Sequence, residues 1–204
     1  MTGCWHPTAP VDRAALVSLN REIDDASAAA VSAEFDEAKR AGAACAILTV
    51  DSGGGLAEAA LRIYRRAKAW TASGRTLIGY IVQARSGASL AALAADFRVL
   101  DPAGHFMIHD LRGGTESERA ALQGQIEDIY LTETFLPLAA VRNYLRGGAW
   151  IVANRDGLKE GWIDTIGGFS AAVGVAVAVA AGDALPATPR RVQMAARGAW
   201  LALA

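Results

Sequence analysis

The sequence lacks any excess of charge of one sign. Its 204 residues include 20 basic and 21 acidic side chains spread along the chain, which gives a formal net charge of −1. Proteins that bind nucleic acid or anionic membranes gather Lys and Arg on one surface, because the phosphates they contact are negative. We therefore expect neither nucleic acid nor a membrane surface as a partner.

Cysteine and histidine are scarce as well. The two cysteines, Cys4 and Cys45, have neither the spacing of metal ligands nor that of a disulfide framework, and the three histidines do not cluster with them. No metal is therefore expected. The cysteine usage fits the reducing environment of the cytoplasm.

Signals for export and membrane insertion are missing too. The N-terminal segment MTGCWHPTAPVD lacks the basic patch and apolar core of a secretory signal. The longest weakly polar run, at 170–182, is shorter than the roughly 20 residues that cross a bilayer. With 52% hydrophobic residues, the chain is long enough to form one soluble domain with a sizeable core.

What the sequence does contain is an alternation of buried strands and amphipathic helices. Continuous apolar runs of strand length are typical of strands covered on both faces, and each of the first two is followed by a polar turn and a helix. Strands are expected at 43–50, 76–82, 97–101, 105–109 and 161–168, and helices at 23–42, 56–70, 90–96 and about 116–145, interrupted at Pro137. This pattern predicts an α/β domain of successive βα units.

The pattern weakens beyond Gly168. We interpret 169–204 as an alanine-rich C-terminal tail, separate from a domain at 1–168. Folding back onto the domain, docking on a neighbouring subunit and disorder stay open as alternatives. The apolar end of the tail argues against complete disorder.

A glycine-rich turn, DSGGG, follows the first buried strand at 51–55. Functional groups of an open α/β sheet gather at the carboxyl ends of its strands, and glycine there permits close backbone approaches. Such a turn can present free N–H groups to a negative oxygen. The ordinary alternative is a tight connection from strand to helix.

A second turn, QARSGAS, follows the next buried strand at 83–89. Ser86 could project from this turn as a nucleophile beside the N–H of Gly87, since acyl transfer needs a donor already in position for the oxygen that gains charge. The alternative is that Ser86 caps the following helix. Ser89 could be the true cap or a packing residue.

His109 ends the strand-like segment FMIHD. A histidine at the lip of a sheet can serve as general base to a serine hydroxyl. More ordinarily, it is a half-buried polar residue at a strand end. The glycine turn, the serine turn and the terminal histidine occur together in this order, which favours the catalytic interpretation.

Residues 17–168 resemble the Clp protease proteolytic subunit (ClpP) family, serine peptidases of the ClpP/crotonase-like fold. The resemblance rests on the segments LNREIDD, DSGGGLAEAALRIY, QARSGASLAALAAD and RVLDPAGHFMIHD. It implies an α/β fold of repeated ββα units with a helical handle at 116–146. The short connection from Ser86 to His109 is similar to that of compact phage-type members.

The resemblance also implies a site and a reaction. Ser86 would be the nucleophile and His109 the general base, with the N–H groups of Gly55 and Gly87 as the oxyanion hole and Gly54 helping to shape it. Peptides or unfolded proteins would be hydrolysed through an acyl-enzyme without a cofactor, in a homo-oligomeric ring. The family's processive members carry a longer leader that meets an ATP-dependent unfoldase, and only about sixteen residues precede VSLN here. An unfoldase partner is therefore left open but not favoured.

The acid of the family's triad has no counterpart. The segment TFLPLAAVRNYLRGGAWI aligns with the one that carries the catalytic aspartate, and the matching residue is Gly148. Loss of the acid lowers activity by about 10⁴ in a serine protease. Asp156 or another nearby acid could substitute, a neighbouring subunit could supply one, or the enzyme could be weak or inactive. Asp110 is expected to face away from the site, because successive strand residues face opposite sides.

Two other functions stay open. A non-catalytic structural subunit would keep the fold without the acid, which Gly148 favours. An acyl-CoA enzyme of the crotonase type would use paired N–H donors on a thioester oxygen, but it leaves Ser86 and His109 unexplained.

Overall fold

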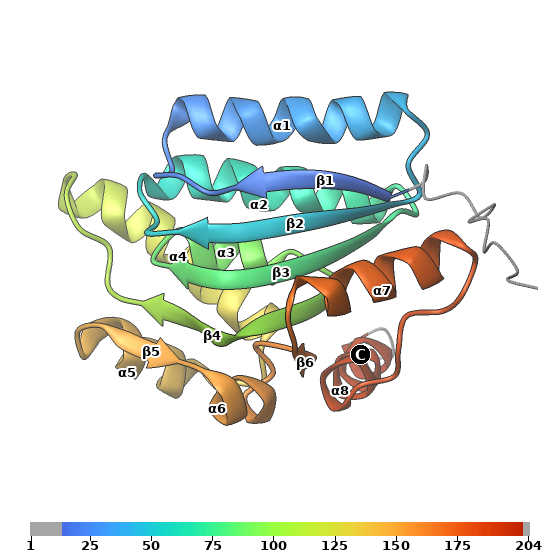
Figure 1. Ribbon diagram of the computed structural model, residues 1–204. Helices are drawn as coiled ribbons and strands as arrows, with labels where there is room; N and C mark the ends of the chain where they lie inside the picture. Colours follow the sequence, from blue (N-terminus) through green and yellow to red (C-terminus); the bar gives the residue numbers. More distant parts are fainter. Residues whose placement is uncertain (1–13, 202–204) are drawn as a thin grey trace, which may run out of the picture.

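Four parallel strands form the centre of the structure, a computed structural model that describes residues 14–201 (Figure 1). They are β1 (Ala14–Leu19), β2 (Cys45–Ser52), β3 (Thr76–Arg85) and β4 (Phe97–Ile108), in that spatial order. Beyond them, β5 (Trp150–Val152) pairs antiparallel with β4, and the short β6 (Thr165–Ile166) pairs parallel with the other end of β4. The predicted α/β fold is confirmed. Cys4, His6 and the rest of the N-terminal segment lie outside the described residues.

Helices cover both faces of the sheet. Figure 1 shows α1 (Asp25–Arg40) and α2 (Ala57–Ala72) on one side and α7 (Phe169–Ala180) on the other. Successive residues of β2 therefore point into different cores. Leu48 belongs to the larger core cluster, and Ile47 belongs to a smaller one that includes Ala172 and Ala176 of α7. A strand that is buried on both faces has a continuous apolar sequence, and β2 shows this pattern.

The helices follow their sequence signals. Helix α1 begins at a capping box between Asp24 and Ser27, and Val31 and Phe35 lie buried on its inner face. Helix α2 buries Ile63 and Trp70 on its apolar stripe. The short α3 (Ala88–Leu93) is buried throughout. All three predicted helices are confirmed.

One prediction about the strands is wrong. The two short strands expected at 97–101 and 105–109 form the single strand β4, and its Pro-Ala-Gly segment does not turn the chain back. The register against β3 runs from Ile81 opposite Leu100 to Gln83 opposite His105, so the extra residues of β4 are accommodated as a bulge. The strand expected at 161–168 is also shorter than predicted, because only β6 pairs within it.

The helical region beyond β4 is divided as its proline predicts. Helix α4 (Glu116–Glu133) starts at a capping box formed by Thr115 and Glu118, and α5 (Leu138–Arg146) has Pro137 as its N-cap. The chain then passes through β5 into α6 (Asn154–Lys159).

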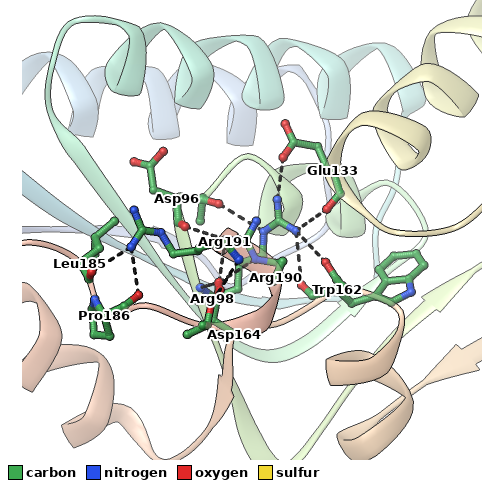
Figure 2. Close-up of polar contacts among 12 residues, drawn as sticks. Asp96, Arg98, Glu133, Trp162, Asp164, Leu185, Pro186, Arg190 and Arg191 are labelled. Atoms are coloured by element: carbon green, nitrogen blue, oxygen red, sulfur yellow. Dashed lines mark hydrogen bonds and ion pairs between the residues drawn. The ribbon is translucent and has the colours of Figure 1, made fainter. Parts of the chain in front are cut away.

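A buried ionic network joins α4 and the C-terminal helices to the sheet (Figure 2). Arg98 of β4 has no exposed surface, and its guanidinium pairs with Glu133 of α4 at 2.7 Å. Its backbone N–H donates to the carboxylate of Asp164, which in turn pairs with Arg190 of α8 (Pro189–Leu201) at 2.6 Å. Helices α7 and α8 thus pack on the body of the protein, while a domain boundary at Gly168 stays a prediction.

Candidate active site

The carboxyl ends of β2, β3 and β4 meet at one edge of the sheet. Ser52 of β2 lies opposite Ala84 of β3, and Arg85 lies opposite Met107 of β4. The N–H of Ser86 then donates to the carbonyl of Met107 at 2.6 Å. This register brings the glycine turn after β2, Ser86 after β3 and His109 after β4 to the same edge, as the sequence pattern predicts.

Ser86 adopts a conformation that serines rarely take. Its φ is 52°, in the left-handed region that costs an L-residue about 1–2 kcal/mol. The N-cap of α3 is Gly87, and no side chain caps that helix. Ser86 is therefore not a capping residue. Its strained turn places a partly exposed serine at the start of a helix, and such backbone strain is found most often at functional sites.

Gly54 allows the glycine turn to touch the serine turn. A Cβ at this position would lie 2.5 Å from the carbonyl oxygen of Arg85 and 2.7 Å from Cβ of Ser86. The N–H of Gly54 is already used, because it donates to Oγ of Ser52 at 3.1 Å, and this hydroxyl donates to the carbonyl of Arg21. Gly54 thus shapes the site and does not offer its own N–H.

Gly55 and Gly87 line the same cavity as Ser86. Gly55 has φ 151°, and a Cβ there would lie 2.1 Å from the carbonyl oxygen of Ile23. Within residues 14–201, neither of the two N–H groups donates a hydrogen bond. They flank Ser86 on the wall of one cavity, so they can serve as the donors of an oxyanion hole.

Two hollows meet at Ser86 and His109. The first is a cavity of about 170 Å³ whose lining is mainly apolar, with Leu56, Leu90, Leu111, Ile126 and Leu145. The second is more open and is bounded by Glu22, Gly54 and Gly55. A small, mainly apolar cavity of this kind suits a hydrophobic side chain of a ligand.

The imidazole of His109 is held by a backbone carbonyl. Its Nδ1 lies 2.5 Å from the carbonyl oxygen of Asp110. A carbonyl only accepts, so Nδ1 carries the proton and Nε2 of the neutral ring is free to accept one. In the described part of the chain no hydrogen bond joins His109 to Ser86, a contact that often tightens only when substrate binds.

Gly148 lies beside the histidine segment, where the family's acid would stand. The antiparallel pairing of β4 with β5 ends at Ile108 opposite Trp150, one residue before His109 and two residues after Gly148. Gly148 has φ 102°, and a Cβ there would meet nothing within 4 Å. The position is close to the sheet edge that carries His109, but it has no carboxylate.

The predicted substitute, Asp156, lies elsewhere. It sits exposed on α6, and it lines neither of the hollows that contain Ser86 and His109. Burial raises the pKa of Tyr144, the neighbouring Glu160 raises it further, and the charge of Asp156 adds the smallest contribution. Among the described residues, the carboxylates that share these hollows with His109 are Glu22 and Asp110.

Sequence reasoning missed Glu22. It precedes Ile23, which pairs with Gly55 in an isolated bridge, and this contact brings the first turn of the chain to the glycine turn. The segment LNREIDD was part of the family resemblance, but only the folded chain brings its glutamate to the site.

Comparisons with known proteins identify a family and a fold for this chain. A family model described as Clp protease matches residues 6–168. The structure is similar to that of a ClpP1 point mutant from Listeria monocytogenes, with a TM-score of 0.67 and 18% identity over 79% of this chain and 95% of that chain. The search of curated proteins returned no match. Among the described residues, no helix is long and apolar enough to span a membrane, and no cluster of His, Cys, Asp and Glu could hold a metal.

Proposed function

The chain belongs to the Clp protease family, and we propose that it is a serine peptidase that cleaves peptides or unfolded proteins through an acyl-enzyme on Ser86. One observation carries the proposal. Ser86 stands in a strained turn, on a cavity wall that it shares with His109 and with the unpaired N–H groups of Gly55 and Gly87. A structural serine needs none of these neighbours.

The reaction follows from these groups. Oγ of Ser86 attacks the peptide carbonyl while Nε2 of His109 takes its proton, and the N–H groups of Gly55 and Gly87 bind the resulting oxyanion. The intermediate collapses as His109 gives the proton to the leaving amine. Water, deprotonated by His109, then attacks the acyl ester and releases the acid, with Ser86 recovering its proton. No cofactor takes part.

The missing acid sets the expected rate. The carbonyl of Asp110 fixes the tautomer of His109 but supplies no full negative charge for the imidazolium that forms. We therefore expect slow turnover unless Glu22, Asp156 or a neighbouring subunit provides a carboxylate. The exposed position of Asp156 makes it a weaker candidate than Glu22.

A structural subunit is the second candidate function. Gly148 favours it, because a glycine at φ 102° stands in the place of the triad acid. Such a subunit would keep the fold and join a ring without cleaving peptides. The crotonase alternative is supported only by the paired N–H groups of Gly55 and Gly87.

Assembly is proposed on family grounds. We infer a homo-oligomeric ring that packs through the handle formed by α4 and α5, and exposed apolar side chains of Leu138, Trp150 and Ile151 lie on and beside it. An unfoldase partner and a location in the cytoplasm stay predictions.

Covalent labelling tests the proposed peptidase. Wild type, Ser86→Ala and His109→Ala would be treated with a fluorophosphonate and weighed intact, with the exposed Ser117→Ala as a control. Labelling of wild type and Ser117→Ala that both site substitutions abolish supports the peptidase. A folded, assembled wild type that takes up no label contradicts it. Binding of an acyl-CoA by that protein would favour the crotonase function, and its absence the structural subunit.

A further inference from the structure

Two buried hydroxyl groups link the nucleophile turn to the handle. The carbonyl oxygen of Ser86 accepts the N–H of Ser89 at 3.0 Å and its Oγ–H at 2.6 Å. Oγ of Ser89 also lies 2.7 Å from the hydroxyl of Tyr130 in α4. Ser89 is 0% exposed and Tyr130 is 3% exposed, so water does not compete for these bonds.

The direction of the chain of hydrogen bonds follows from its chemistry. A hydroxyl carries one hydrogen, and a carbonyl only accepts. The hydroxyl of Ser89 donates its one hydrogen to the carbonyl of Ser86, so the hydroxyl of Tyr130 must donate to Oγ of Ser89. The hydrogen bonds therefore run from the hydroxyl of Tyr130 through Oγ of Ser89 to the carbonyl oxygen of Ser86, and we call this chain the relay.

That carbonyl belongs to the same peptide group as the N–H of Gly87. The group is planar and trans, so its oxygen and its N–H point in opposite directions. Hydrogen bonds that hold the oxygen on the buried side therefore aim the N–H toward the site. They also polarise the peptide group, which makes the N–H a stronger donor.

The far end of the relay is firmly anchored. The ring of Tyr130 packs against Trp162 with centroids 5.5 Å apart. Glu133, one turn later in α4, pairs with the buried Arg98 and with Lys68, and Figure 2 shows the pair with Arg98. A hydroxyl mounted on so constrained a helix can hold the strained Ser86 turn in place.

We propose that Ser89 and Tyr130 are positioning residues that aim and polarise the Gly87 N–H of the oxyanion hole. The inference rests on the proposed peptidase function, and it names two residues that act through the peptide group and not by contact with substrate. It explains why a serine stands at the third position after the nucleophile, inside a helix that is otherwise alanine and leucine.

Kinetics of fluorophosphonate labelling and of ester hydrolysis test the relay. Removing a direct oxyanion donor lowers kcat by about 10²–10³, so loss of an indirect one should lower kcat by about tenfold with KM unchanged. We expect this for Ser89→Ala and Tyr130→Phe, with the double variant no slower than Ser89→Ala, and recovery in Ser89→Thr. Tyr80→Phe is the control, because it removes a phenol hydroxyl that binds Asp101 far from the site. Wild-type rates in Ser89→Ala and Tyr130→Phe would overturn the inference.

A second series separates this inference from the proposed function. In a Ser86→Cys background, the pH dependence of iodoacetamide alkylation at residue 86 reports the thiol pKa without any acyl chemistry. Nearby N–H donors lower a thiol pKa, so Ser89→Ala and Tyr130→Phe should raise it. If wild type takes no fluorophosphonate label, the peptidase proposal fails, and an unchanged thiol pKa in this series would overturn the relay independently.

Discussion

Placing an aspartate at position 148 should restore part of a catalytic triad. The antiparallel pairing of β4 with β5 ends at Ile108 opposite Trp150, and both His109 and Gly148 lie within two residues of this pair. A carboxylate in Gly148→Asp would therefore project beside the segment that holds His109. It would supply the negative charge that the carbonyl of Asp110 lacks.

The structure also sets the cost of Gly148→Asp. At φ 102° an L-residue is strained by about 1–2 kcal/mol, and no neighbour within 4 Å adds a steric term. For a chain of this length, that cost lowers Tm by roughly 2–8 °C. The variant should fold.

The expected gain is a faster reaction of Ser86. Loss of the acid from a complete triad costs about 10⁴, and an exposed carboxylate recovers only part of this because solvent screens it, so we expect a gain of at least about tenfold. The assay is the second-order rate constant of fluorophosphonate labelling. Gly148→Asn is the matched control, because it has the same shape and backbone strain without the charge. Equal rates in the folded Asp and Asn variants would refute the reasoning.

Three further predictions concern the turn, the buried network and the C-terminal helices. Gly54→Ala should slow labelling on the order of 10²-fold, because its Cβ would lie only 2.5 Å from the carbonyl oxygen of Arg85 and would push the serine turn out of place. Gly53→Ala is the control, because a Cβ there meets nothing within 4 Å, and it should be labelled at the wild-type rate. Glu133→Gln should lower the free energy of unfolding in urea by about 3–5 kcal/mol, because it leaves Arg98 buried and unpaired. Burial alone would raise the pKa of Glu133, but Arg98 and Lys68 hold it below its ordinary value. The ionised Glu133 therefore adds to the free energy of unfolding at any pH above its pKa in the unfolded chain, and this contribution is lost as the pH falls through its lower pKa in the folded protein. Urea unfolding of Glu133→Gln at a series of pH values should lack this loss of stability at acid pH. Arg190→Met should cost about 3–5 kcal/mol by leaving Asp164 unpaired, and Asp164→Asn should recover part of it in the double variant. Arg191→Met, which gives up only hydrogen bonds to the carbonyls of Leu185 and Pro186, should cost far less, and a similar loss in both variants would contradict the role of the ion pair.

The sequence by itself determined the elements that obey local rules. Apolar runs of strand length identified β2 and β3, and capping residues and apolar stripes identified α1 and α2. The order of glycine turn, Ser86 and His109 indicated one edge of a parallel sheet. These signals are local because backbone propensity and side-chain periodicity act over a few residues.

Only the tertiary structure decided which partners these groups meet. The Pro-Ala-Gly segment reads as a turn, but pairing with β3 keeps it inside the strand β4 as a bulge. Helix α7 looked like part of a weakly patterned tail, yet its small alanines let it pack closely on the sheet. In both cases long-range packing overrode a local preference.

The same distinction holds within the site. The pattern of turns singled out Ser86 and the family resemblance singled out Gly148, but neither revealed that Ser86 is strained or that Asp156 lies outside both hollows. Glu22 and Tyr130 reach the site from distant segments, and nothing in their neighbouring residues marks them. Their roles depend on hydrogen bonds and cavities that exist only once the sheet and the handle have packed together, since such contacts join residues far apart in the chain.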